Sequence, residues 1–483
     1  MEKFTDLGNA RRFVARLSDP ARKGRRRIVL PVGFVRQNYL TCGPATLTAV
    51  SKYWSMPAEH LQVAEEICYD GTSEYSERKW ALTHGWAVRS FTVTEEAAEQ
   101  LIAAGVPFTV STIDPGNAHL QAVVGCDGRR GSLIIRDSTI RTRGEADCEE
   151  FLARYRAFGP RGMALTPLAE ARRIEGLALP DADLWDRIYE LDHALQNHQR
   201  PKAASIVERF RAELPDHFLA FEAARRLAVY DGNPLAELES VERLCEKFPG
   251  NAVLDLVRLE LMRHLGRRQS RLEALEELHA KPDADTAFLP ALAQELAADA
   301  RTHERAIQLL RRAIGKRPGD SWCYYLLGTV LQDQLRFDEA LELHRFAACL
   351  SDKREQYSES YFTAAQYSRA TDEALEWLRR RFERFGDKSG LPAQTLVWAL
   401  QSLERPEEAL RVVEEAVRRR PTDGALKLFA AQVFASTSGD YLGRARDLLD
   451  EAESQCSRPE WLRIWAARQR ARRPRRGRTW AAP

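Results

Sequence analysis

Residues 35–50 read VRQNYLTCGPATLTAV, and this stretch decides how the N-terminal part of the chain is interpreted. A loop leads to Cys42, Gly43 and Pro44 follow, and an apolar periodicity then predicts a helix to about Trp54. Proline is tolerated in the first helical turn, so Cys42 is expected at a helix N-terminus. There the helix dipole favours a thiolate over a thiol, and the thiolate is the attacking form. Cys42 is therefore the candidate nucleophile.

A cysteine nucleophile needs a base, and this part of the chain offers His60, His84 and His119. His84 precedes Gly85 at an expected helix end, which indicates a C-terminal capping role. His60 lies in an acidic helical stretch and is expected on a solvated face. His119 begins a segment with the pattern of a strand, and we expect it to be the base.

Residues 119–125 read HLQAVVG and residues 132–138 read SLIIRDS, with a turn rich in glycine and charge between them. This pattern predicts a β-hairpin. Folding the hairpin about its turn brings Asp137 back near His119, although the register stays open. A carboxylate there would orient the imidazole and support its charged form, as in triad chemistry generally.

Gln37 stands five residues before Cys42 and is a candidate oxyanion donor, together with the backbone N–H of Cys42. The ordered motifs Gln-x4-Cys-Gly-Pro-Ala, His-Leu-Gln-Ala-Val-Val-Gly and Arg-Asp-Ser resemble the papain-like bacteriocin-processing peptidases. Those enzymes cleave leader peptides after double-glycine motifs, usually as the N-terminal part of an export transporter. The resemblance implies an α+β papain-like fold, with Cys42 as nucleophile and His119 as base. It further implies Asp137 as the orienting carboxylate and Gln37 as the oxyanion residue.

Two positions depart from the family pattern. The family usually has six residues from glutamine to cysteine, and here there are five, which leaves Arg36 and Asn38 open as alternatives to Gln37. The family often has an aspartate-proline pair where this chain has Asp137 and Ser138. No run of about 18 uncharged apolar residues occurs, so no transmembrane helix and no transporter domain are expected.

The second half of the chain repeats at the tetratricopeptide period. A small residue recurs after an acidic or polar helix start, with spacings of 34, 34 and 35 residues, as Ala306, Ala340, Ala374 and Ala409. Around the second of these, Gly328 falls at a further family position on the preceding helix. Small residues let two helices approach closely, so that each pair buries its apolar face on the next. We expect an all-α superhelix of roughly eight units, whose groove binds a peptide or protein.

Charge and cysteine content give no support for a nucleic-acid partner, a membrane partner or a zinc site. The net charge of +2 gives no general argument for a nucleic-acid or membrane partner. The eight cysteines include no C-x-x-C pair, so a zinc or redox site is not expected. The predicted cysteine chemistry implies no metal and no organic cofactor. Scattered cysteines in a chain of 483 residues indicate buried thiols in a reducing compartment, which predicts a cytoplasmic location.

A chain of this length is expected to hold more than one domain. The predicted segments are a basic N-terminal segment (1–27), a papain-like cysteine peptidase domain (28–167), a linker (168–182), the tetratricopeptide-type repeats (183–467) and a basic C-terminal tail (468–483). Both basic segments are interpreted as solvated tails, since no nucleic-acid-binding motif accompanies them.

The leading hypothesis is a bacterial-type cysteine peptidase that acts through an acyl-enzyme on Cys42, while the repeats recruit a protein or peptide partner. A papain-like fold also supports acyl or amide transfer, and the shared acyl-enzyme means that the residues do not separate transfer from hydrolysis. The alternative of another class is a catalytically degenerate scaffold that acts as an interaction module. The full set of Cys42, His119 and Asp137 argues against the scaffold, whereas the short spacing from Gln37 to Cys42 argues weakly for it.

Overall fold

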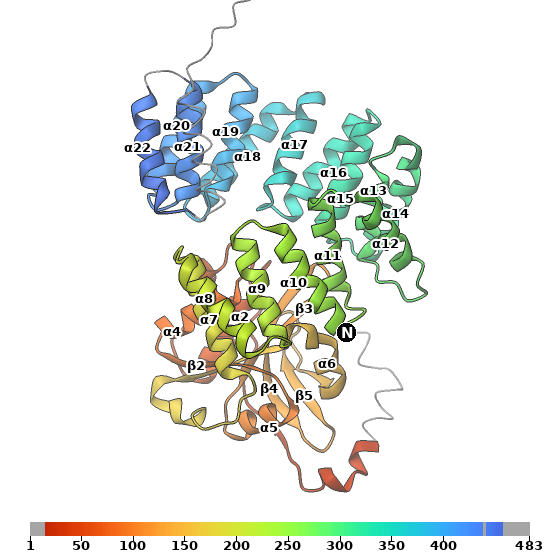
Figure 1. The fold of residues 1–483 in the computed structure, drawn as a ribbon, viewed down its shortest axis with the longest axis vertical. Coiled ribbons are helices and arrows are strands. Elements are labelled where there is room, and N and C mark those ends of the chain that lie inside the picture. Colours follow the sequence, from red (N-terminus) through yellow and green to blue (C-terminus); the bar gives the residue numbers. More distant parts are fainter. Residues whose placement is uncertain (1–14, 438–440, 457–483) are drawn as a thin grey trace, which may run out of the picture. The chain divides into compact units, whose positions relative to one another are not determined.

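The computed structural model describes residues 15–437 and 441–456. Within these residues the chain forms two compact units, each with its own hydrophobic core (Figure 1). The first unit comprises the residues up to Leu227 together with Leu238–Arg258, and the second comprises Ala228–Glu237 together with the residues from Leu259 on. No helix in the described ranges is long and apolar enough to span a membrane.

Seven strands of the described chain form one antiparallel sheet in the first unit, in the order β2-β7-β3-β4-β5-β6, with β1 paired to β4. The strands are β1 (Arg27–Val29), β2 (Trp86–Thr92), β3 (Phe108–Asp114), β4 (Asn117–Asp127), β5 (Ser132–Arg136), β6 (Gly144–Asp147) and β7 (Arg161–Pro167). β4 is the central strand, because it pairs with β1, β3 and β5. An antiparallel sheet with separate helices is an α+β arrangement, so the predicted fold class of this part is confirmed.

Several short helices accompany the sheet. They are α2 (Cys42–Tyr53), α3 (His60–Ile67), α4 (Glu74–Thr83), α5 (Glu95–Ala103) and α6 (Cys148–Tyr155), with the 3₁₀ turns η2 (Pro20–Arg22), η3 (Arg156–Phe158) and η4 (Leu168–Arg173). The side chains of Ser73, Thr94 and Asp147 cap α4, α5 and α6 by accepting a backbone N–H three residues on. α2 differs, because its N-cap residue Thr41 makes no such bond. The first-turn N–H groups beside Cys42 are therefore not capped by Thr41.

The predicted hairpin is confirmed as β4 and β5. β4 begins at Asn117, two residues before the expected start, and Ala122 pairs with Arg136 across the hairpin. Asp137 directly follows β5. Because side chains alternate along a strand, His119 and Gln121 lie on one face of β4.

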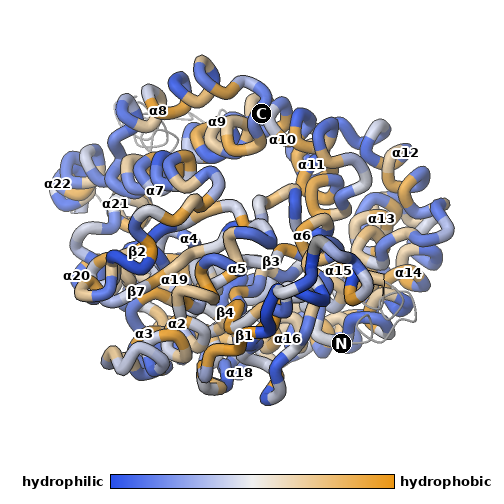
Figure 2. Tube along the Cα trace, turned by 90° about the horizontal axis from the view of Figure 1, so that it is seen from below, coloured by the Kyte–Doolittle hydropathy of each residue, from blue (hydrophilic) through white to orange (hydrophobic). Residues whose placement is uncertain are grey.

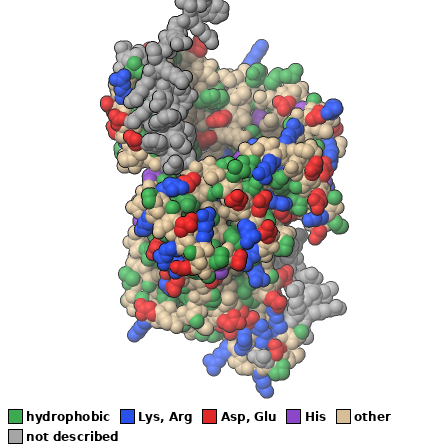
Figure 3. Space-filling model, viewed as in Figure 1, with side chains coloured by type: hydrophobic (Ala, Val, Ile, Leu, Met, Phe, Trp, Pro, Cys, Tyr) green, Lys and Arg blue, Asp and Glu red, His purple; other side chains and the backbone are tan. Residues whose placement is uncertain are grey.

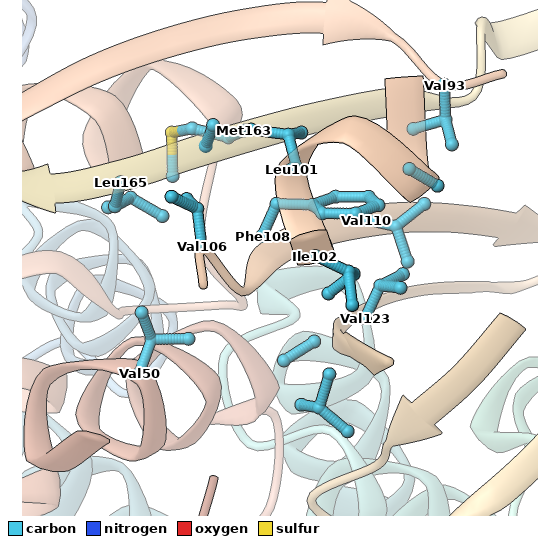
Figure 4. Close-up of a cluster of buried hydrophobic side chains, with 14 of the residues drawn as sticks. Val50, Val93, Leu101, Ile102, Val106, Phe108, Val110, Val123, Met163 and Leu165 are labelled. Carbon is cyan, nitrogen blue, oxygen red and sulfur yellow. The ribbon is translucent and has the colours of Figure 1, made fainter. Parts of the chain in front are cut away.

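A single hydrophobic core joins α2 and α5 to the sheet. Figure 4 shows Val50 of α2 and Ile102 of α5 in the same cluster as Phe108 of β3, Val123 of β4 and Met163 of β7. Each of these five side chains is at most 1% exposed. This core fixes α2, which begins at Cys42, against the strand that carries His119.

One buried hydrogen bond sets the position of α2 on β4. Thr46 Oγ1 donates to the carbonyl oxygen of Leu120 at 2.9 Å. Thr46 lies four residues after Cys42, so the two share a face of the helix. Leu120 follows His119 in the strand. The bond therefore links the helix that carries Cys42 to the strand that carries His119.

Residues 168–182, which the sequence suggested as a linker, pack against the sheet. Ile174 belongs to the hydrophobic core. Thr92 at the end of β2 donates its backbone N–H to the Pro180 carbonyl at 2.8 Å and its hydroxyl to Asp181 at 2.6 Å. The chain is thus held to the sheet edge until α7 begins.

The basic residues before β1 are not a solvated tail. Arg22 is 2.5 Å from Glu95, and Arg25 pairs with Glu95 at 3.0 Å and with Glu99 at 3.2 Å. The predicted C-terminal tail lies outside the described residues. On the face seen in Figure 3, basic and acidic side chains are interspersed, as the small net charge suggests.

The remaining described helices, α7–α22, are sixteen in number and form eight consecutive pairs along the chain. They are α7 (Ala182–Gln196), α8 (Arg200–Glu213), α9 (Phe218–Tyr230), α10 (Pro234–Lys247), α11 (Ala252–His264), α12 (Arg268–His279), α13 (Phe288–Leu296), α14 (His303–Lys316), α15 (Ser321–Asp333), α16 (Phe337–Leu350), α17 (Glu355–Tyr367), α18 (Thr371–Phe385), α19 (Leu391–Ser402), α20 (Pro406–Arg419), α21 (Gly424–Thr437) and α22 (Leu442–Glu453), with the 3₁₀ turn η5 (Ala300–Thr302) before α14. Hydrophobic and hydrophilic residues alternate along these helices (Figure 2). The predicted all-α array is confirmed.

The repeat alanines explain how the helices of the second unit pack. Each is the fourth residue of its helix and at most 1% exposed, namely Ala306 in α14, Ala340 in α16, Ala374 in α18 and Ala409 in α20. Gly328 of α15 also allows two paired helices to approach closely. A Cβ at this position would lie 2.9 Å from the ring of His344 in α16. Small residues thus set the close approach of paired helices, as the sequence predicted.

Two neighbouring threonines of α2 test the link between this helix and β4. Thr46→Val removes the hydroxyl that Leu120 accepts from, and we expect the sheet to lose about 1–3 kcal/mol of stability. The matched control is Thr48→Val, since Thr48 is equally buried but its hydroxyl has no hydrogen-bond partner among the described residues. That change is expected to be neutral or stabilising. Native-state hydrogen exchange of the β4 amides measures both, and equal effects would contradict the assignment.

Candidate active site

Cys42 is the first residue of α2, as the sequence predicted. Its side chain is half-buried and its thiol is free. Gly43 follows, and a Cβ at that position would lie 3.1 Å from Cβ of Thr72, so glycine lets the segment before α4 approach the start of the helix. The nucleophile candidate therefore stands at an uncapped helix N-terminus, where backbone N–H groups can stabilise negative charge.

His119 contacts both Cys42 and Asp137. Its Nε2 lies 3.2 Å from Oδ1 of Asp137, and this contact is an ion pair when the imidazole is protonated. Burial disfavours the imidazolium, but the contacts with Asp137 and with the Cys42 thiol outweigh it and raise the pKa of His119 to about 9. The histidine is therefore charged at neutral pH.

Asp137 is held by donors on both of its oxygens. Oδ2 accepts from Gln121 Nε2 at 2.6 Å, while Oδ1 accepts from the backbone N–H and the hydroxyl of Thr139 at 2.7 and 2.6 Å. Burial alone would raise the pKa of this carboxyl, but the contact with His119 and the hydrogen bonds from Thr139 hold the pKa well below its ordinary value. Asp137 thus stays ionised and fixed.

Gln121 and Thr139 were not among the candidate residues predicted from the sequence. Each could have been predicted from its position in the sequence. Gln121 lies two residues after His119 and therefore on the same face of the strand. The spacing Asp137-x-Thr139 is typical of an Asx turn, in which the aspartate side chain accepts a backbone N–H two residues on.

Gln37 lies against the residue that follows Asp137. Its backbone N–H donates to the carbonyl of Ser138 at 3.1 Å, and its side-chain Oε1 accepts from the Ser138 hydroxyl at 2.6 Å. The alternatives Arg36 and Asn38 are exposed. The structure therefore connects Cys42, His119 and Asp137 directly and brings Gln37 beside this set through Ser138.

A tight turn connects Gln37 to Cys42. Thr41 Oγ1 accepts the backbone N–H of Asn38 at 2.8 Å and donates to the carbonyl of the same residue at 3.1 Å. His60 Nε2 lies 2.9 Å from that hydroxyl, and Cys68 Sγ donates to the Leu40 carbonyl at 3.3 Å. Leu40 has φ 58°, the left-handed region that a closed turn requires.

The expected solvated position of His60 is therefore wrong. Burial lowers the pKa of His60, which favours the neutral ring. Since the Thr41 hydroxyl donates to Asn38, its remaining lone pair suits a donor from Nε2 of His60. The acidic neighbours in the sequence hid this contact, which forms between residues 19 positions apart. The expectation for His84 is confirmed, because His84 is the C-cap residue of α4.

A buried chain of charges adjoins the start of α2. Oε1 of Glu77 lies 3.4 Å from the position of a Cβ on Gly43, and its other oxygen pairs with Arg161. Arg161 Nε is 3.0 Å from Glu74, and Glu74 is 3.1 Å from Arg226 of α9. Burial raises the pKa of Glu77 to about 7 in spite of Arg161. This network links the surroundings of the nucleophile to α9 within the first unit.

A pocket of about 380 Å³ lies in the first unit. Ser73, which follows the Thr72 that would contact a Cβ on Gly43, is one of its lining residues. Its lining comes from α3, α4 and α7 and comprises Glu66, Ile67, Ser73, Tyr75, Ser76, Lys79, Trp80, Thr83 and Gln196. The volume is in the range of small-ligand and side-chain pockets. Among the described residues, no group of three or more His, Cys, Asp or Glu side chains could hold a metal ion.

Comparison with known proteins supports the resemblance stated from the motifs. Residues 29–163 match the model of the Peptidase_C39 like family. This match covers α2, β2 to β6 and thus both strands of the hairpin that places His119 near Asp137. No curated protein matches the chain.

Solved structures of tetratricopeptide proteins resemble part of the chain at low identity. YrrB, a TPR protein with an unusual peptide-binding site, is 18% identical with a TM-score of 0.25, over 41% of this chain and 99% of that one. MamA is 17% identical with a TM-score of 0.27, over 36% and 95%. A tetratricopeptide repeat protein from Parabacteroides merdae is 12% identical with a TM-score of 0.31, over 51% and 98%.

The repeat type follows from this chain's own pattern, in which buried alanines recur at the fourth position of alternate helices. Residues 29–163 therefore form a Peptidase_C39-like domain, and the helix pairs that follow it are of the tetratricopeptide type.

Proposed function

We propose that this protein is a cysteine peptidase that hydrolyses a peptide bond through an acyl-enzyme on Cys42. The observation that carries the proposal is the contact chain from Cys42 through His119 to Asp137, with a charged imidazole at its centre. An imidazolium placed between a thiol and an ionised carboxylate is the arrangement that activates a cysteine as a nucleophile. The match of residues 29–163 to a peptidase-like family supports the same reading.

In the proposed mechanism the Cys42 sulfur attacks the carbonyl carbon of the scissile bond. The C–S bond forms while the carbonyl electron pair moves onto oxygen, and the first-turn N–H groups of α2 stabilise this oxyanion. His119 then donates its proton to the leaving amine as the C–N bond breaks. In the second half, His119 takes a proton from water, which attacks the acyl-enzyme and releases Cys42. Asp137 keeps its charge throughout and orients the ring.

Substrate recruitment is proposed for the repeats. Stacked helix pairs present an extended surface, and a peptide or protein held on it is kept at a raised local concentration near the nucleophile. The pocket beside Ser73 is proposed to take a substrate side chain, because it starts next to the segment that packs on Gly43. A reducing compartment such as the cytoplasm suits this enzyme, since Cys42 must remain the free thiol that it is here.

Thiol labelling tests the proposed nucleophile. A peptide-like epoxide probe is expected to modify Cys42 at least about 100-fold faster than exposed Cys349, because only Cys42 is paired with an imidazolium. Labelling should be abolished in Cys42→Ala and fall strongly in His119→Ala, with Cys349→Ala as the matched control that changes nothing at Cys42. Mass spectrometry locates and times the adducts. Equal rates at the two cysteines would refute the enzyme proposal.

Hydrolysis itself is tested with a peptide library. We expect wild-type protein to generate new peptide termini, detected by mass spectrometry, and Cys42→Ala to generate none. Fast labelling without any cleavage would instead indicate a latent or transferring site.

The pH dependence follows from His119. Because the pKa of this histidine is raised to about 9, the imidazolium is present below that pH and is lost as the pH rises through it. Labelling of Cys42 by the epoxide, whose opening oxygen needs a proton, should therefore decline with a midpoint near pH 9. In Asp137→Asn the counter-charge is gone, and the midpoint should move down by about one unit or more. An unchanged midpoint would show that Asp137 does not support the imidazolium.

A further inference from the structure

The side-chain amide of Gln37 is held at one end only. Ser138 donates its hydroxyl to Oε1 at 2.6 Å, whereas no described residue accepts a hydrogen bond from Nε2. An amide has an acceptor on one side and donors on the other, so fixing the oxygen also fixes the direction of the NH₂ group. The free end of Gln37 is thus its donor end.

Ser138 is itself fixed in place. It is 4% exposed, and its carbonyl accepts the backbone N–H of Gln37 at 3.1 Å. It lies between Asp137 and Thr139, which are bonded to each other through backbone and side chain. The hydroxyl therefore approaches Gln37 from a rigid segment, and the loop before α2 is attached to it by two hydrogen bonds.

The loop is closed at its other end by Thr41, which bonds both to Asn38 and to His60. Only the turn between Asn38 and Thr41 separates Gln37 from Cys42. Gln37 is thus connected on one side to Ser138 and on the other to the start of α2, where Cys42 lies. Ser138 follows Asp137, which pairs with His119.

We propose that Ser138 is a positioning residue that aims the NH₂ group of Gln37 at the oxyanion formed on the Cys42 adduct. The inference rests on the proposed peptidase function and adds a residue to it. Without the hydroxyl the amide can rotate and present its oxygen, which repels an oxyanion. Ser138 acts through Gln37 alone and has no role in forming the nucleophile.

A small peptide aldehyde, acetyl-Gly-glycinal, measures this role directly. The Cys42 sulfur adds to its carbonyl carbon, and the carbonyl electron pair becomes an oxyanion, while the thiol proton stays on His119 as the imidazolium. Affinity for such an adduct reports oxyanion stabilisation, as for other mimics of a transition state. It is measured as protection of Cys42 against iodoacetamide, whose displacement of iodide forms no oxyanion.

We expect Gln37→Ala to weaken aldehyde binding about 100-fold, the usual effect of removing an oxyanion donor. Ser138→Ala should weaken it about 10-fold, and Ser138→Ala added to Gln37→Ala should have no further effect. The matched control is Ser132→Ala, which removes another buried serine hydroxyl, bonded to Glu145 at 2.7 Å, and should leave aldehyde affinity unchanged.

Iodoacetamide rates separate the possible failures. If Cys42 in the wild type reacts no faster than Cys349, the peptidase proposal itself fails. If Cys42 reacts fast in every variant, which also shows that the variants are folded, the aldehyde data decide the role of Ser138. The inference is overturned if Ser138→Ala weakens aldehyde binding equally in the wild type and in Gln37→Ala. It is also overturned if Ser138→Ala does not weaken aldehyde binding in the wild type.

Discussion

The ion pair between His119 and Asp137 is the interaction on which the rest of the candidate site depends. A buried imidazolium costs several kcal/mol unless a fixed opposite charge compensates it. Asp137 provides that charge because Gln121 and Thr139 occupy its other lone pairs and hold it in place. The sheet makes this possible: β4 carries the histidine, and β5 returns the aspartate to the same face. The register of the hairpin therefore brings His119 and Asp137 together.

The sequence predicted the parts of this arrangement that depend on local pattern. Strand alternation and a glycine-rich turn indicated the hairpin, and the Gly43–Pro44 pair indicated the helix start at Cys42. The alanine period indicated the repeats, because each alanine packs within its own helix pair. Contacts between distant residues had no such signal. Gln37 and Ser138 are 101 positions apart, and neither residue type is unusual in a loop.

Contacts among charged residues of separate helices had no signal in the sequence pattern. Glu74 and Glu77 in α4 and Arg226 in α9 form a network through Arg161, whose side chain is buried. Removing one member of such a network leaves an uncompensated charge, so its members depend on one another. A boundary drawn at residue 167 from composition therefore cuts between residues that the first unit needs together.

The loop from Gln37 to Cys42 is one residue shorter than in the family pattern, and the structure shows how the backbone accommodates this. A missing residue in a loop would displace one of its ends unless the backbone closes more tightly. Here Leu40 adopts φ 58°, and the Thr41 hydroxyl closes the turn onto Asn38. A left-handed residue other than glycine carries strain, which persists only where surrounding contacts hold it. His60 and Cys68 supply those contacts on one side and Ser138 on the other. The departure from the family spacing is thus absorbed within the turn, and Gln37 remains beside the candidate site through Ser138.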